Sequence, residues 1–176
     1  MAYAQNPYSN WNTDSSSGGS PSILGALPYT NSSYPLPPGD LLTFTFTSLN
    51  PNILNCTVLG PNNRAYFAIS TDATMPGCTA RGLLQKQKIS HWLRLSPDRS
   101  HRVIEIRGAR YMWGPQEQYI SLWTSGSNMR DRRCLARISK TYNIVSLEMA
   151  AEAMQLGLLE ACVITTVLLQ CGRNID

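Results

Sequence analysis

The chain has 176 residues, the size of one domain with a tail, and 43% of them are hydrophobic while only 15% are charged. Its net charge of +4 is uneven, because residues 81–140 contain thirteen Lys or Arg against four Asp or Glu. This basic middle part either attracts phosphate groups or is a solvated face without a ligand. The first residues lack the basic and apolar regions of a signal peptide, which argues against a secreted protein.

The first segment, residues 1–40, is rich in Ser, Asn, Pro, Gly and Tyr, and its apolar residues follow no period. Such a segment cannot bury enough apolar surface to offset the entropy lost on ordering. We therefore predict a disordered tail over residues 1–40 and a single domain over residues 41–176. The aromatic residues of the tail are candidate contact points for another protein, but a spacer is the role that we favour.

From Leu42 the pattern changes to strict alternation, with Leu42, Phe44 and Phe46 on one face of a predicted strand and threonines on the other. Turn residues such as Pro61-Asn62-Asn63 and Ser96-Pro97-Asp98 separate further short runs of the same kind. Short strands at this spacing are typical of an antiparallel barrel or sandwich. The runs are NCTVLG (55–60), RAYFAIS (64–70), ISHWLRLS (89–96), HRVIEIRG (101–108), RYMWGP (110–115), QYISLW (118–123), CLARIS (134–139) and YNIVSLEM (142–149).

The last segment, residues 150–171, is rich in helix formers and predicts one continuous helix of roughly 33 Å at 1.5 Å per residue. That length would suit a bilayer, so a membrane anchor is one interpretation. However, Glu152, Gln155 and Glu160 interrupt the apolar stretch, and a spanning helix needs about twenty mostly apolar residues. A short helix that is apolar all round is more often buried in a core, which is the interpretation we favour.

Four stretches, LTFTFTSLNPNILNCTVLGPNNRAYFAIST, ISHWLRLSPDRSHRVIEIRGARYMWGP, LARIS and LEMAAEAMQLGLLEACVITTVLLQCGRNID, resemble an uncharacterised family of mushroom-forming fungi. That family is grouped with the tubby-like and LURP-one-like proteins. The resemblance covers residues 41–176 and implies a closed antiparallel β-barrel around a hydrophobic C-terminal helix. Relatives carry a further strand pair between the positions of Cys78 and Gly82. The resemblance therefore implies a barrel from which one strand pair is missing, with an open place in its wall.

No catalytic signature or cofactor-binding motif occurs in the sequence, and neither His91 nor His101 lies at metal-ligand spacing from another ligand. A thiol–imidazole pair assembled by the fold stays open, with Cys56, Cys78 and Cys134 as the candidate thiols. We therefore predict no catalytic residue, metal ligand or cofactor, and an enzyme is the third of three functional classes.

The basic cluster is the one positive signal for a site. It consists of Lys86, Lys88, Arg130, Arg132, Arg133 and Arg137. Arginine forks bind phosphate oxygens in a bidentate way, which suits an anionic phospholipid headgroup. The leading prediction is a non-catalytic module in the cytoplasm that attaches peripherally to membranes through this cluster, without a transmembrane span. A protein-interaction module that uses an exposed sheet edge or the tail is the alternative, and the absence of a nucleic-acid motif argues against nucleic acid.

Overall fold

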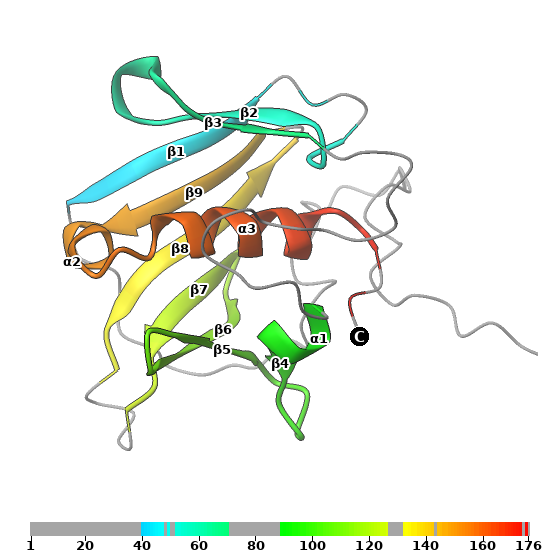
Figure 1. Ribbon diagram of the computed structural model, residues 1–176, viewed down its shortest axis with the longest axis vertical. Helices are drawn as coiled ribbons and strands as arrows, with labels where there is room; N and C mark the ends of the chain where they lie inside the picture. Colours follow the sequence, from blue (N-terminus) through cyan, green and yellow to red (C-terminus); the bar gives the residue numbers. More distant parts are fainter. Residues whose placement is uncertain are drawn as a thin grey trace, which may run out of the picture.

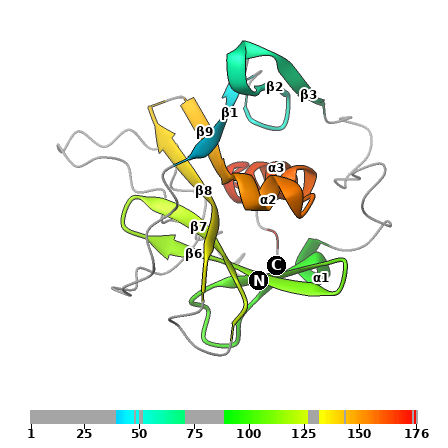
Figure 2. The same ribbon diagram turned by 90° about the vertical axis from the view of Figure 1, so that its left-hand side faces the viewer.

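The computed structural model describes residues 40–47, 49, 52–70, 89–126, 132–142, 144–173 and 175. The central feature of this part of the chain is one nine-stranded antiparallel sheet with the order β3-β2-β1-β9-β8-β7-β6-β5-β4. Figures 1 and 2 show that the sheet curls around helix α3. The strands are β1 (Leu41–Thr47), β2 (Cys56–Leu59), β3 (Ala65–Ile69), β4 (Leu93–Leu95), β5 (Arg102–Ile106), β6 (Ala109–Gln116), β7 (Tyr119–Thr124), β8 (Cys134–Thr141) and β9 (Ile144–Ala150). The helices are η3 (Pro61–Asn63), α1 (Ile89–Trp92), α2 (Ala151–Gln155) and α3 (Leu159–Gln170).

Strand β1 shows why the alternating pattern forms a sheet with one buried face. Phe44 and Phe46 are 0% and 1% exposed and belong to the core, whereas Thr43 between the strand's apolar positions is exposed. Successive side chains of a strand point to opposite faces, so Phe44 and Phe46 pack into the core, while Leu42, at the start of the same face, is 36% exposed. β1 pairs with β2 on one side and with β9 on the other. The prediction of short antiparallel strands is confirmed, and β1 buries one face as its alternation predicts, except at Leu42. β6 and β7 differ, because they bury the successive residues 111–115 and 120–123 and are therefore covered on both faces.

Three tight hairpins set the register of the strands that carry most of the basic residues. Their turns contain residues with positive φ, namely Arg107 at 52°, Glu117 at 51° and Tyr142 at 51°. Two-residue turns of this left-handed type match the twist of antiparallel strands. The resulting pairing places Arg110 opposite Glu105. It also places Arg137 opposite Glu148, so the hairpins decide which charges meet.

Helix α3 is the centre of the core. Eight of its residues are buried, and they lie on all sides of the helix: Ala161, Cys162, Val163, Thr165, Thr166, Val167, Leu168 and Leu169. Thr165 and Thr166 donate their hydroxyl hydrogens to the carbonyl oxygens of Ala161 and Cys162, at 2.8 and 2.7 Å. The buried hydroxyls are thus satisfied within the helix. The prediction that this apolar stretch lies in the core is confirmed. Of the helices within the described ranges, none combines the length and apolarity that a bilayer crossing requires.

The prediction of one continuous helix over residues 150–171 is wrong, because the chain turns between α2 and α3. Gly157 has φ +68°, and its N–H donates to the carbonyl oxygen of Met154, while the N–H of Leu158 donates to that of Ala153. These two bonds form a Schellman motif, in which a left-handed residue closes a helix. Leu158 and Ala153 are both buried and supply the hydrophobic contact that accompanies this motif.

One further expectation differs from the structure, and the closure of the barrel that the resemblance implies is not confirmed. The pattern of residues 89–96 predicts a wholly extended run, but Ile89–Trp92 forms the short helix α1 before β4 begins. In the described part of the chain the sheet is open, and its end strands β3 and β4 pair only with β2 and β5. The stretch between Cys78 and Gly82 and the predicted tail, apart from Asp40, lie outside the described residues.

Candidate functional site

The sheet brings five arginines to one end and to the adjoining outer face. We call this surface the arginine rim and define it as Arg94, Arg107, Arg110, Arg132 and Arg133. The first three come from β4, from the turn between β5 and β6, and from β6 itself, while the last two directly precede β8. The backbone N–H of Thr124, at the end of β7, donates a hydrogen bond to the carbonyl oxygen of Arg133. The N–H of Ser125 donates to the carbonyl oxygen of Arg110. The ends of β6, β7 and β8 are therefore adjacent, and α2 lies at the same end because it follows β9.

Arg133 and Arg137, which the sequence places in the basic cluster, are both engaged by carboxylates. Arg133 Nη1 lies 2.6 Å from Glu152 Oε1 in the first turn of α2. Arg137 forms an ion pair with Glu148, its cross-strand neighbour on β9, and its guanidinium carbon lies 4.5 Å from the centre of the Tyr119 ring. A guanidinium held by a carboxylate and an aromatic face has little freedom to bind phosphate. Arg137 therefore lies within the sheet, with its guanidinium engaged by Glu148 and Tyr119.

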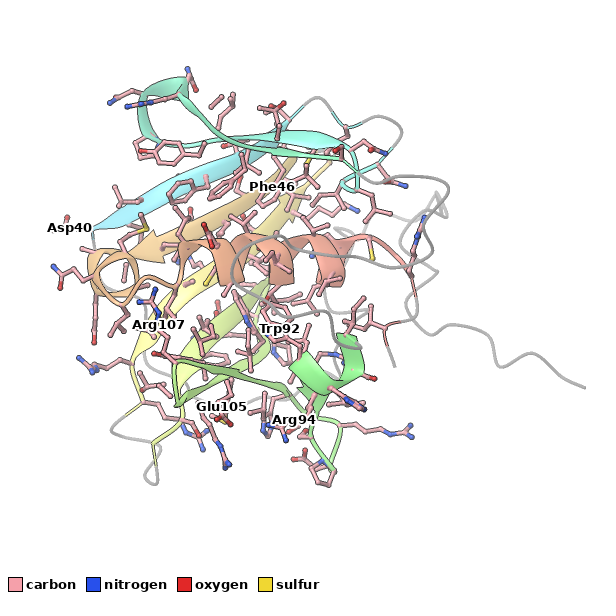
Figure 3. All side chains as sticks on the ribbon, viewed as in Figure 1. Asp40, Phe46, Trp92, Arg94, Glu105 and Arg107 are labelled. Carbon is pink, nitrogen blue, oxygen red and sulfur yellow. The ribbon has the colours of Figure 1, made fainter. Side chains whose placement is uncertain are left out.

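Arg94 and Arg110 share a single carboxylate. Their guanidinium nitrogens lie 3.8 and 3.5 Å from Glu105 Oε2, and the two arginine side chains are 56% and 68% exposed. Figure 3 shows Arg94 and Glu105 on the outer side of the sheet, away from the side of α3. Two guanidinium groups with one carboxylate leave an excess positive charge on this face, accessible to solvent.

Arg107 and Arg132 have no carboxylate at ion-pair distance within the described residues. The Arg132 side chain is half-buried, and among the same residues its Nε has no hydrogen-bond partner. Arg107 reaches the turn after α2, where its Nη1 lies 2.9 Å from the position that a Cβ of Gly157 would occupy (Figure 3). A cation at the C-terminal end of a helix is favourable, so Arg107 also stabilises this corner.

The sequence-predicted site is therefore only partly assembled by the described residues. Arg132 and Arg133 lie together at the rim, Arg137 lies within the sheet, and Lys86, Lys88 and Arg130 fall outside the described residues. Sequence reasoning missed three rim members, Arg94, Arg107 and Arg110, because they are scattered along the chain and only the hairpin register joins them. Alternation within residues 101–115 was the available signal, since it puts Glu105 and Arg110 on the outer face.

Not every basic residue of the middle part is available to a ligand. Arg102 is 0% exposed, and its Nη1 donates a hydrogen bond of 3.1 Å to the carbonyl oxygen of Leu93. Burial also lowers the pKa of Lys140 below its usual value. The high count of cations in residues 81–140 thus overstates the charge that reaches the surface.

A serine, a histidine and an aspartate meet in the turn between β4 and β5, but their geometry is that of a turn. The Ser100 hydroxyl donates to Asp98 Oδ2 at 2.7 Å and lies 2.8 Å from His101 Nδ1. In a hydrolytic triad the imidazole lies between the hydroxyl and the carboxylate. Here the hydroxyl lies between the other two groups. Hydrogen bonds from Ser96 and Ser100 hold the pKa of Asp98 well below its usual range.

The buried thiols are poor nucleophiles. Burial raises the pKa of Cys56 and of Cys134 to about 11, and it also raises the pKa of Cys162. A thiol with a raised pKa is protonated at neutral pH, whereas attack on a substrate requires the thiolate. Cys78 lies outside the described residues. No group of three His, Cys, Asp or Glu side chains that could hold a metal ion is found in the described ranges.

Comparisons of the chain with protein-family profiles, with curated proteins and with solved structures find no match. The arrangement of charges in the structure is therefore the basis for taking the arginine rim as the candidate functional site.

Proposed function

We propose that the chain is a non-catalytic binding module that recognises anionic phospholipid headgroups at a membrane surface through the arginine rim. The main supporting observation is the imbalance of ion pairs at the rim: among the described residues, three of its five guanidinium groups lie at ion-pair distance from a carboxylate, and they share Glu105 and Glu152. Guanidinium groups in excess at a solvent-exposed surface attract phosphate oxygens and form bidentate hydrogen bonds with them.

The attachment is peripheral and electrostatic. Each Lys or Arg near an anionic bilayer contributes on the order of 1 kcal/mol, and salt screens this attraction over about 8 Å at physiological ionic strength. Binding of this kind takes place on the cytoplasmic side, where anionic lipids are concentrated. The resemblance to the fungal family grouped with tubby-like proteins supports this proposal, as does the curled sheet around a buried helix. On this proposal the sheet is the wall of a tubby-like barrel.

The test is co-sedimentation of the full chain with vesicles of phosphatidylcholine alone, with added phosphatidylserine, and with added phosphoinositide, across a salt series. The rim variant is Arg107→Ala combined with Arg132→Ala. The matched control is Arg99→Ala combined with Arg173→Ala, because it removes the same charge from two positions outside the rim, the turn between β4 and β5 and the residues after α3. The match extends to the backbone, since Arg99 and Arg107 have φ values of 57° and 52°.

We expect the rim variant to bind anionic vesicles about 30-fold more weakly, which corresponds to two arginines at about 1 kcal/mol each. The control should bind nearly as well as the parent, and soluble inositol phosphate should compete if the headgroup itself is recognised. If the parent ignores anionic vesicles at low salt, or if both variants lose binding equally, the rim is not a headgroup site.

A further inference from the structure

Leu156, in the turn between α2 and α3, is an exposed leucine with rim arginines close to it. It is 39% exposed, and its N–H donates a hydrogen bond of 2.9 Å to the carbonyl oxygen of Glu152. Glu152 and Leu156 are thus one helical turn apart, on the same face of α2. Glu152 pairs with Arg133, and Arg107 reaches Gly157, the residue after Leu156. Leu156 therefore has one rim arginine held just before it and another just after it.

The surface around Leu156 has little net charge. Residues 151–158 contain one charged side chain, Glu152, and the ion pair with Arg133 neutralises it. The other exposed side chains of this stretch belong to Ala151 and Gln155. Taking such a surface out of water costs less than burying one with an unpaired charge.

Single exposed apolar residues are common on protein surfaces, so exposure alone does not distinguish Leu156. The described part of the chain also exposes Leu42, Tyr66, Tyr142 and Ile144. Tyr142 and Ile144 lie at the turn between β8 and β9, whereas α2 follows the other end of β9. Leu42 lies at the same end as α2, but close to the carboxylate of Asp40 at the start of β1 (Figure 3). The neighbouring arginines are what distinguish Leu156.

We propose that Leu156 enters the apolar boundary of an anionic bilayer when the rim binds its headgroups, an inference that rests on the proposed function. An apolar tip beside cations matches a membrane surface, where phosphate groups lie above the acyl chains. Asp40 and Glu160, two exposed carboxylates at this end of the fold, remain among the headgroups. The insertion is therefore shallow, about 5 Å, at the lower end of the depth that interfacial helices reach.

Leu156→Ser tests the apolar contact by co-sedimentation with vesicles that contain phosphatidylserine or phosphoinositide. We expect binding about three- to eightfold weaker, because the exposed two-fifths of the leucine lose their burial in the bilayer. This factor should stay constant as the salt concentration rises, whereas the effect of the rim variant should shrink, because salt screens charges and not apolar contacts.

Ile144→Ser is the matched control. Ile144 is 54% exposed, so the substitution removes at least as much exposed apolar surface, but from the opposite end of β9. This control should bind like the parent. Both serine variants should keep the melting temperature of the parent, since each replaces an exposed side chain.

A tryptophan at position 156 locates the side chain directly. With Leu156→Trp, phospholipids brominated near the top of the acyl chains should quench fluorescence more strongly than they quench the parent, and the emission should shift to the blue on anionic vesicles. The parent supplies the background of the four native tryptophans, of which Trp92, Trp113 and Trp123 are buried. Ile144→Trp is the control and should show no additional quenching.

The outcomes separate this inference from the function on which it rests. If the parent binds anionic vesicles while Leu156→Trp is quenched no more than Ile144→Trp, the insertion is wrong and the rim remains a headgroup site. The same holds if Leu156→Ser binds as tightly as the parent, or if Ile144→Ser loses as much binding. A parent chain that ignores anionic vesicles at low salt overturns the insertion together with the proposed function.

Discussion

Replacing Gly157 with alanine tests whether the chain turns between α2 and α3 or continues as one helix. The two structures predict opposite changes in the free energy of unfolding. If residues 150–171 formed one helix, Gly157→Ala would stabilise the protein by about 1 kcal/mol, since alanine is the better helix former. In the structure Gly157 has φ +68°, where a side chain costs roughly 1–2 kcal/mol. A Cβ there would lie 2.9 Å from Arg107 Nη1, which is the mobile end of a long side chain and can shift at little cost.

We therefore expect Gly157→Ala to lower the free energy of unfolding by about 1–2 kcal/mol in urea titrations followed by circular dichroism. Gly108→Ala is the matched control, because Gly108 has φ +78° and no atom lies within 4 Å of the position that its Cβ would occupy. The difference between the two variants measures the contact with Arg107. A Gly157→Ala variant as stable as the parent, or more stable, would refute the turn.

Three further changes test the core, the cross-strand ion pair and the β4–β5 turn. Val163→Asp places an unpaired carboxylate on the buried helix α3 and should lower the free energy of unfolding by several kcal/mol. An unchanged melting temperature would contradict the burial of this helix. A double-mutant cycle of Arg137→Ala and Glu148→Ala should show a coupling energy of about 1 kcal/mol, because the two side chains are only 25% and 22% exposed. Additive effects of the two substitutions would contradict the ion pair. The pKa of Asp98 is lowered in the folded state, so its contribution is present above about pH 4 and is lost as the pH falls. The stability deficit of Asp98→Asn should accordingly be largest at neutral pH and shrink in acid, and a deficit that is independent of pH would count against the turn.

The strands could be predicted from the sequence because their signal is local. Phe44 and Phe46 alternate with threonines, and that pattern alone decides which face of β1 is buried. Helix α3 was predictable for the same reason, as a short apolar stretch with few charges. The turn at Gly157 was missed because strong helix formers surround it. A single glycine ends the helix there because the turn buries Leu158 in the core, and this burial depends on the tertiary structure and not on the local sequence.

The site was less predictable because it depends on contacts between distant residues. Arg130, Arg132 and Arg133 are neighbours in the sequence, but the partner of Arg133 is Glu152, on a helix that follows β9. Arg94 and Arg110 meet at Glu105 only because two hairpins bring three strands side by side. Charge counts along a chain cannot show which cations are neutralised, since neutralisation depends on the register.

The position of β1 beside β9 has a consequence for how the chain acquires its structure. Leu41 pairs with Ala150, roughly a hundred residues later, and the helix that fills the core follows still further on. During synthesis β1 therefore has neither its second neighbour nor its packing partner until almost the whole domain has left the ribosome. Non-local pairing of this kind is slow, typically in the millisecond-to-second range for β-rich domains. Until then the phenylalanines of β1 remain accessible to other chains, which makes the nascent protein most vulnerable to aggregation just before α3 emerges.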